Sequence, residues 1–425
     1  MDSQGRKAFI ASSLGWGLDG YTWTMFSIAL PTIIVALNMS VSDGGWIVTC
    51  SLLASAIGGV FGGMLADRYG RVRVLSYIIL AFAVSTALTA TAQDMYQLAF
   101  WRIVEGLVYG AEWPVGAALL AEYASAEKRG RVMGYLQAMY AVGWALSTFV
   151  FWIVFANFPA EEAWRYLFLT GIIPALAIFY IRRNVKDRVV IQKNPKAKLP
   201  LIRLFQGKQL RTTVLATLLC IGAQGIYYSI FSFLPLYLVE VRNLALIGTT
   251  LYLCMVIAGS YIGYVSGGYL HDMFGRRKTF SLFFIGSIAT LGLFIFLPIE
   301  GQFVSYVIGF FLGYFASGQA AGIGSFLSEQ FPTAIRATGQ GFSYNVGRGF
   351  AAFSPAFIGV MSGKLGLGNA IISVGLFSFC IAIVAVWLLP ETNGKVIIEE
   401  SEERDSASKS TSVDTVEIGN STVVN

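Results

Sequence analysis

Twelve long apolar runs follow one another along the chain, and they constrain its fold more than any other feature. The runs span approximately 8–37, 44–66, 73–92, 95–122, 130–157, 163–183, 210–239, 245–270, 278–297, 302–328, 337–363 and 367–390. About 20 apolar residues in a helix cross the hydrocarbon core of a bilayer. Only 13% of the residues are charged, whereas a soluble chain carries roughly 25%. The sequence therefore predicts an all-α membrane protein with twelve transmembrane helices.

The basic residues predict the orientation and the domains, because Lys and Arg collect in cytoplasmic loops. With both termini in the cytoplasm, most of the 30 basic residues fall on the inner side. A basic linker over 184–209 separates an N-terminal six-helix bundle, 1–183, from a C-terminal one, 210–390. The Ser/Thr/Glu-rich segment 391–425 is predicted to be a disordered cytoplasmic tail.

The two predicted bundles share a sequence repeat. Residues 63–71 read GMLADRYGR and residues 268–276 read GYLHDMFGR, and each half also has a Glu seven residues before an Arg. A repeat of this length in a membrane chain indicates two structural halves that pack face to face.

The pattern G-x-x-x-D-R-x-G-R between the second and third predicted helices resembles the signature of the major facilitator superfamily, and the resemblance covers the whole chain. It implies a secondary transporter that works by rocking alternating access, with its site midway between the halves. It also implies a cytoplasmic gate of ion pairs, for which the alternative is that these charges only fix loop geometry and topology. The gate residues are Asp67, Arg71, Glu122, Arg129, Arg131, Asp272, Arg276, Glu329 and Arg336.

Shorter motifs resemble carriers of organic acids. Residues 18–21 (LDGY) resemble the D-G-x-D element of sialate and aromatic-acid proton symporters, although Thr22 replaces the second acid. Residues 110–113 (GAEW) resemble a helix-four element of metabolite and sialate symporters, and 341–347 (GFSYNVG) resemble sialate carriers. Arg348, which follows, is closer to the aromatic-acid branch. These resemblances imply an acid carrier.

Five ionisable residues lie deep inside the predicted helices: Asp19, Arg102, Glu105, Glu112 and Arg348. Each costs at least about 2.5 kcal/mol to insert, so each needs a structural or functional reason. In the fourth run, polar residues recur at spacings of three and four and share one stripe of the helix. Such a stripe must face protein or a water-filled cavity rather than lipid. Its members are Arg102, Glu105, Tyr109, Glu112 and Gly116.

We assign candidate roles to these charges. A guanidinium grips a carboxylate through two parallel hydrogen bonds, so Arg348 and Arg102 are candidates for substrate binding. Asp19, Glu112 and Glu105 are candidates for proton coupling. The alternatives are structural ion pairs, Arg102 with Glu105 and Arg348 with Asp19 or Glu112. Polar side chains that both donate and accept hydrogen bonds complete the predicted substrate site: Gln224, Tyr228, Gln319, Tyr344 and Asn345.

Several function classes lack support in the sequence. One histidine and four isolated cysteines give no metal-ligand set, and no nucleophile–base pattern of an enzyme is present. The basic residues lie in short loops rather than on a face for nucleic acid. We therefore expect no cofactor. The expected partners are an organic anion, protons and the lipid bilayer, for a monomer in the cell membrane.

The predicted function is proton-coupled import of an organic anion, most simply a monocarboxylate such as a sugar acid, a hydroxy acid or an aromatic acid. One alternative is a carrier of an uncharged or cationic metabolite whose buried charges are structural. Another is a non-transporting sensor on the same fold.

Overall fold

A computed structural model describes residues 3–69, 71–123, 129–176, 202–244, 249–297, 302–332 and 335–392, all of them helical or connecting segments. The α-helices are α1 (Ser3–Ala36), α2 (Val41–Tyr69), α3 (Arg71–Thr89), α4 (Met95–Tyr123), α5 (Arg129–Asn157), α6 (Ala160–Leu169), α8 (Gly207–Phe231), α9 (Leu234–Glu240), α10 (Thr249–Phe274), α11 (Arg276–Phe296), α12 (Gln302–Gly318), α13 (Ala320–Gln330), α14 (Arg336–Ala351), α15 (Phe353–Leu365) and α16 (Leu367–Leu388). Two 3₁₀ helices, η2 (Thr170–Leu176) and η3 (Ile202–Phe205), accompany them.

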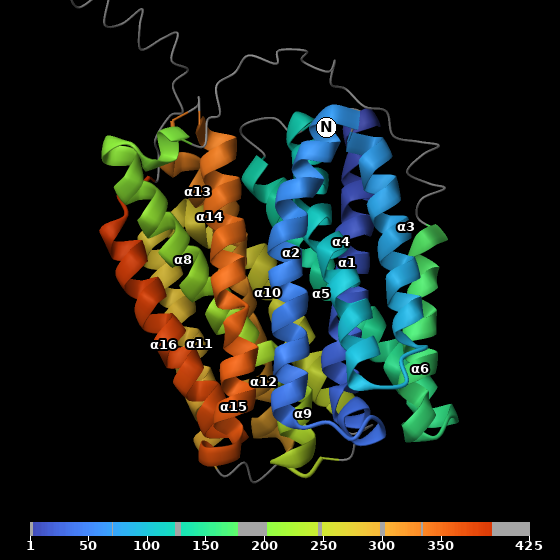
Figure 1. Ribbon diagram of the computed structural model, residues 1–425. Helices are drawn as coiled ribbons and strands as arrows, with labels where there is room; N and C mark the ends of the chain where they lie inside the picture. The colour runs from blue at the N-terminus through green and yellow to red at the C-terminus, as the bar shows by residue number, and fades with distance from the viewer. Residues whose placement is uncertain are drawn as a thin grey trace, which may run out of the picture.

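The helices run side by side in one bundle (Figure 1). In this view, α3 and α6 lie at one side and α8, α11 and α16 at the other. Between them, α2 packs against α14 and α15, α5 against α10, and α1 against α9. In the described part of the chain, these segments form twelve helices when α8/α9, α12/α13 and α14/α15 count as one broken helix each. Seven of the described helices are long and apolar enough to cross a membrane.

Three of the predicted runs form broken rather than continuous helices, and prolines explain two of the breaks. Pro235 lies at the start of α9 and has no N–H for the carbonyl of Phe231, four residues earlier. That carbonyl instead accepts a hydrogen bond of 2.8 Å from the hydroxyl of Ser27 on α1. Pro355 follows the second break, at Ala352, and likewise has no N–H to donate to the carbonyl four residues earlier. The third break, at Gln319, has no proline.

Two other predicted boundaries differ from the structure. The run 163–183 begins as α6 at Ala160 and changes to the 3₁₀ helix η2 after Leu169, and its residues beyond 176 lie outside the described residues. The predicted linker 184–209 is helical at its end, since η3 covers 202–205 and α8 begins at Gly207.

Small residues set the distance between several helix pairs. A Cβ on Gly143 of α5 would lie 1.7 Å from the carbonyl oxygen of Gly17 on α1. On α10, a Cβ on Gly263 would lie 2.3 Å from the carbonyl oxygen of Tyr314. Because real Cβ atoms cannot come so close, these helices touch backbone to backbone, as membrane helices with small interface residues do.

One end of the bundle, where α9 lies, is closed by contacts between α2 and α15. A Cβ on Gly45 would lie 2.5 Å from the carbonyl oxygen of Pro355, and one on Gly359 would lie 2.9 Å from the Cα of Ser42. The N–H of Ala356 also donates to the hydroxyl of Thr49 at 3.2 Å. These contacts leave no room between the two helices at this end.

Candidate substrate and proton site

Arg348 of α14 lies at the centre of a cluster of polar and aromatic side chains and is 2% exposed. Its Nη2 donates to the hydroxyl of Tyr344 at 3.1 Å, and its Nε lies 3.5 Å from Oε1 of Gln224. The guanidinium carbon lies 5.0 Å from the ring centre of Tyr344 and 5.3 Å from that of Tyr109 on α4. The cluster therefore joins α4, α8 and α14 around one buried cation.

The partners of Arg348 are neutral. Among the described residues, no ion pair joins Arg348 to a carboxylate, so the alternative of a salt bridge to Asp19 or Glu112 is not realised in this structure. Asp19 is nevertheless close enough to interact electrostatically with Arg348. A buried cation held only by hydroxyl, amide and ring groups can still accept an anion.

Asp19 of α1 and Glu112 of α4 face each other beside this cluster. They are 1% and 2% exposed, and their carboxyl groups lie close enough to interact electrostatically. Gly15, one turn before Asp19, makes the contact possible, because a Cβ there would lie 2.0 Å from Oε1 of Glu112. Two carboxyl groups in contact can share one proton.

Arg102 and Glu105 of α4 form an ion pair of 2.7 Å, with Arg102 1% exposed and Glu105 fully buried. The guanidinium of Arg102 also lies over the rings of Trp23 and Phe26, at 5.2 and 4.6 Å. The structure thus realises the ion pair that the spacing of three residues allows, and it places Arg102 apart from the cluster around Arg348.

The remaining predicted substrate residues divide into two groups. Tyr228 shares Gln224 with Arg348 and belongs to the cluster. Asn345 points towards α2, since a Cβ on Gly59 would lie 2.5 Å from its Oδ1. Gln319 donates to the carbonyl oxygens of Ala223 and Ala316, and so braces the break between α12 and α13.

An aromatic stack that the sequence interpretation did not identify contacts both arginines. Trp23 stacks on Tyr109 with ring centres 4.9 Å apart and an interplanar angle of 20°. Arg348 lies over Tyr109, and Arg102 lies over Trp23. Tyr109 belongs to the polar stripe of α4, but no periodic signal marks its stacking partner Trp23, because the contact joins α1 and α4 and the sequence does not give contacts between helices.

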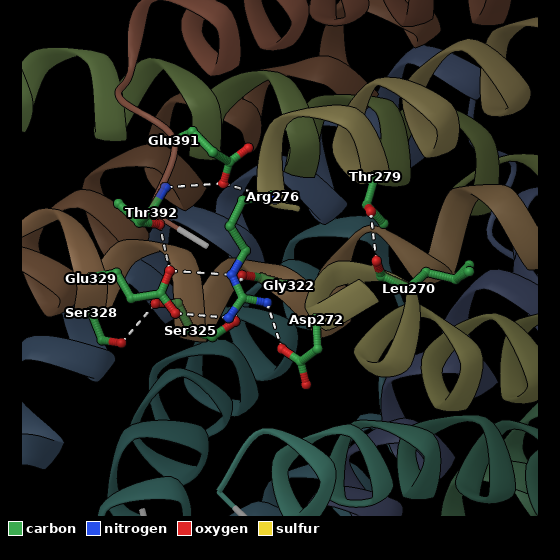
Figure 2. A network of polar contacts seen from close by, with 10 residues as sticks. All are labelled: Leu270, Asp272, Arg276, Thr279, Gly322, Ser325, Ser328, Glu329, Glu391 and Thr392. Atoms are coloured by element: carbon green, nitrogen blue, oxygen red, sulfur yellow. Dashed lines mark hydrogen bonds and ion pairs between the residues drawn. The ribbon is translucent and has the colours of Figure 1, made fainter. Parts of the chain in front are cut away.

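A cluster of ion pairs in the C-terminal part of the chain centres on Arg276, as Figure 2 shows. Its Nη2 and Nε donate to the two carboxylate oxygens of Glu329 at 2.8 and 3.2 Å, and its Nη1 donates to Asp272 at 2.9 Å. Such two-pronged pairing fixes the angle between α10, α11 and α13. The structure therefore brings together Asp272, Arg276 and Glu329, three of the predicted gate residues.

Glu391 and Thr392, which the sequence interpretation assigned to a disordered tail, are instead held in this network. The carboxylate of Glu391 accepts hydrogen bonds from the backbone N–H groups of Arg276 and Arg277 at 3.0 and 2.9 Å. The hydroxyl of Thr392 donates to Glu329. The sequence does offer a signal for this contact. The first N–H groups of a helix need acceptors, and an acidic residue directly after Pro390, at the end of the last apolar run, can supply them.

His271, one residue before Asp272, is buried beneath the network. It is 1% exposed, and in the described part of the chain neither ring nitrogen has a hydrogen-bond partner. Its ring packs edge to face against Phe280 at 4.5 Å, and a Cβ on Gly322 would lie 2.1 Å from its Nε2. The side chains of the other predicted gate residues, Asp67, Arg71, Glu122, Arg129, Arg131 and Arg336, lie outside the described part of the structure, and so do the surroundings of Gly116.

A bundle of membrane-crossing helices with buried cations and carboxyl groups between them is the arrangement of a membrane transport protein. The profile of the Major Facilitator Superfamily matches residues 13–342 and 262–417, and the chain belongs to that family. It is therefore a transporter of the cell membrane and not an enzyme.

Relatives and solved structures agree with this assignment. A probable 4-methylmuconolactone transporter of Cupriavidus pinatubonensis is 37% identical over 408 residues, 95% of each chain. A cis,cis-muconate transport protein of Acinetobacter baylyi is 30% identical over 90% of this chain and 94% of its own. The sialic acid transporter NanX of Escherichia coli is 27% identical over 90% and 93%. The crystal structure of a D-xylose-proton symporter superposes with a TM-score of 0.74 at 20% identity, over 93% of this chain and all of the other.

Proposed function

We propose that this protein imports an organic anion, most simply a monocarboxylate, together with protons. The observation that carries the proposal is Arg348: a fully buried guanidinium whose described partners are all neutral, next to a pair of carboxyl groups. A substrate carboxylate would complete the charge of Arg348, and a proton on the Asp19–Glu112 pair would remove a negative charge beside it. Two of the three relatives are named for organic acids, cis,cis-muconate and sialic acid, which favours the same substrate class.

The transport cycle that we propose is rocking alternating access between two six-helix halves, 1–183 and 210–390, joined by 184–209, with both termini in the cytoplasm. Loading an anion with a proton keeps the net charge of the site constant, so the barrier to moving buried charges through the membrane stays low. The ion pairs around Arg276 would keep the cytoplasmic end closed while the anion and the proton bind, and they would open to release both. We propose that a monomer suffices, since the site lies within one chain.

The test uses purified protein in liposomes that contain a pH-reporting dye. Sialate, gluconate and 4-hydroxybenzoate are added outside in turn, with neutral sugars and protein-free liposomes as controls. We expect one acid to acidify the lumen, and we expect Asp19→Asn and Arg348→Gln to abolish the signal. The variant Lys364→Gln, which changes an exposed residue at the end of α15, should transport normally.

Uptake of a neutral or cationic solute with no proton movement for any acid would overturn the proposal. Asp19, Glu112 and Arg348 would then be structural charges, and the carrier would belong to the alternative class of uncharged or cationic metabolites.

A further inference from the structure

A pocket lies towards the α9 end of the bundle, next to Trp23 and Arg102. Its walls come from α1, α2, α4 and α5 on one side and from α8, α9 and their junction on the other. In this closed arrangement it holds about 30 Å³, room for roughly one water molecule. Because its two walls belong to the two proposed halves, the pocket must widen when those halves part.

Two buried donors in this pocket have no acceptor. Arg102 and Trp144 both line it and are 1% and 4% exposed. Within the described part of the chain, Nε of Arg102 and Nε1 of Trp144 have no hydrogen-bond partner. An unsatisfied buried N–H costs about 1–3 kcal/mol. Both groups donate only, so the ligand that would satisfy them must supply acceptor oxygens.

The remaining walls are mostly aromatic. Phe231 packs edge to face against Trp144 at 5.0 Å and against Tyr227 at 4.6 Å. Trp23 and Phe26 add two more ring faces. The hydroxyl groups of Thr24 and Ser27 are already engaged, with Ser147 and with the backbone of α8. Walls made mostly of ring faces suit a planar aromatic body better than a polyhydroxylated one.

The charge of the pocket determines how an anion could enter it. Arg102 and Glu105 together are neutral, so an extra carboxylate would bring an unpaired buried charge. If Glu105 takes up one proton, its bond to Arg102 weakens, and the substrate carboxylate can take its place on the guanidinium. One proton and one carboxylate enter together, and the net charge of the pocket does not change.

The titratable groups that face this ion pair from other helices are few. Asp19 of α1 is close enough to Glu105 for an electrostatic interaction, and three tyrosines of α5 and α8 line the pocket: Tyr140, Tyr227 and Tyr228. Asp19 is already engaged with Glu112. Glu105 is therefore the carboxyl group in direct contact with the pocket's cation.

We propose that Arg102, Trp144 and the rings around them form a separate loading site for an aromatic carboxylate, where the acid displaces a protonated Glu105 before it passes the Trp23–Tyr109 stack to Arg348. The inference rests on the proposed acid–proton symport. It adds an initial binding site, names aromatic carboxylates as the substrate class, and identifies Glu105 as the carboxyl group that is protonated at this site. The stack links the two arginines, since Trp23 contacts the guanidinium of Arg102 and Tyr109 contacts that of Arg348.

The experiment measures equilibrium binding of radiolabelled 4-hydroxybenzoate to the purified full chain, with gluconate as the polyhydroxylated control. All variants carry Arg348→Gln, which removes the central cation. We expect this background to keep saturable binding that tightens towards acidic pH. Adding Glu105→Gln mimics the protonated acid, so binding at mildly alkaline pH should tighten by about tenfold or more and lose its pH dependence. Adding Arg102→Gln should abolish binding, and Arg102→Lys should weaken it less.

Loss of all saturable binding in the Arg348→Gln background, while the wild-type protein still moves protons with the acid, would overturn the loading site but not the symport. Residual binding that does not respond to Glu105→Gln would overturn the proton exchange. Acid binding without proton movement by the wild-type protein would overturn the symport and leave the site at Arg102 standing. Equal binding of gluconate and 4-hydroxybenzoate would overturn the aromatic specificity. Thermal unfolding of each variant separates lost binding from lost fold.

Discussion

Ser27 on α1 compensates for Pro235 on α9. Pro235 has no N–H to donate to the carbonyl of Phe231, and the hydroxyl of Ser27 donates to that carbonyl instead. We expect Ser27→Ala to lower the free energy of unfolding by about 1–3 kcal/mol, since the carbonyl of Phe231 is left without its donor. Pro235→Ala restores an N–H for that carbonyl, so the double variant should recover much of the loss. A double-mutant cycle on thermal unfolding measures the coupling. Additive losses would show that Ser27 does not serve the helix break.

At the scale of single residues, the sequence identified the buried charges well and their partners poorly. Asp19, Arg102, Glu105, Glu112 and Arg348 stand out because an ionisable group inside an apolar run must have a reason. The spacing of three residues also allowed the pair of Arg102 with Glu105. The contact of Asp19 with Glu112 and the ring stack between the arginines depend on helix packing, which no local pattern encodes.

Glycines allow some helix pairs to touch backbone to backbone, and α10 offers a direct test of this packing. Gly263 and Gly268 both lie on α10, but a Cβ on Gly263 would strike the carbonyl of Tyr314, while one on Gly268 meets nothing within 4 Å. We expect Gly263→Ala to force α10 from α12 and to cost about 1–3 kcal/mol, as overpacking does. Gly268→Ala should be neutral or slightly stabilising. Thermal unfolding in detergent compares them, and equal effects would contradict the packing argument.

The start of α11 depends on an acceptor from beyond α16. We expect Glu391→Ala to cost about 0.5–2 kcal/mol, the range for loss of a helix cap, and Glu391→Gln to cost less because one acceptor remains. Hydrogen exchange at the amides of Arg276 and Arg277 reports the change directly. Unchanged protection of these two amides in the alanine variant would contradict the role of Glu391 as a cap.

At the scale of elements, the twelve apolar runs predicted the helices, and two prolines marked breaks that the runs alone did not show. The break at Gln319 had no such marker. Its side chain donates to the carbonyl oxygen of Ala316, one turn earlier, and to α8, so a competing side-chain bond accompanies the interruption. Broken helices of this kind need tertiary contacts, which explains why hydropathy gave a continuous run.

For the whole molecule, the contact of α2 with α15 predicts a way to hold one end open. Gly45→Leu must push Pro355 away, since even a Cβ would lie 2.5 Å from its carbonyl oxygen. An overpacking cost of about 1–3 kcal/mol would shift the balance of states by roughly fivefold to 150-fold. We expect uptake into liposomes to fall by that factor while acid binding persists. Gly363→Leu, on α15 with open space around it, is the control, and equal losses in both variants would sink the prediction.

The sequence predicted the class of the whole molecule because membrane helices must be long and apolar, and because the repeated loop motif resembles one superfamily. It could not place the two ends of the bundle in a closed or open state. That property depends on contacts such as Gly45 with Pro355, which join distant parts of the chain.

The single buried histidine, His271, is an intrinsic chemical probe for the separation of the helices around it. His271 is sealed between α10, α11 and α13 by Phe280, Phe283 and Gly322, so an acylating reagent reaches the imidazole only during moments when those helices separate. Because the chain of 425 residues has one histidine, mass spectrometry of the peptide that contains His271 measures the rate of its modification without any introduced label. We expect the marking rate to track the opening of the Arg276 network, and Glu329→Gln to accelerate it.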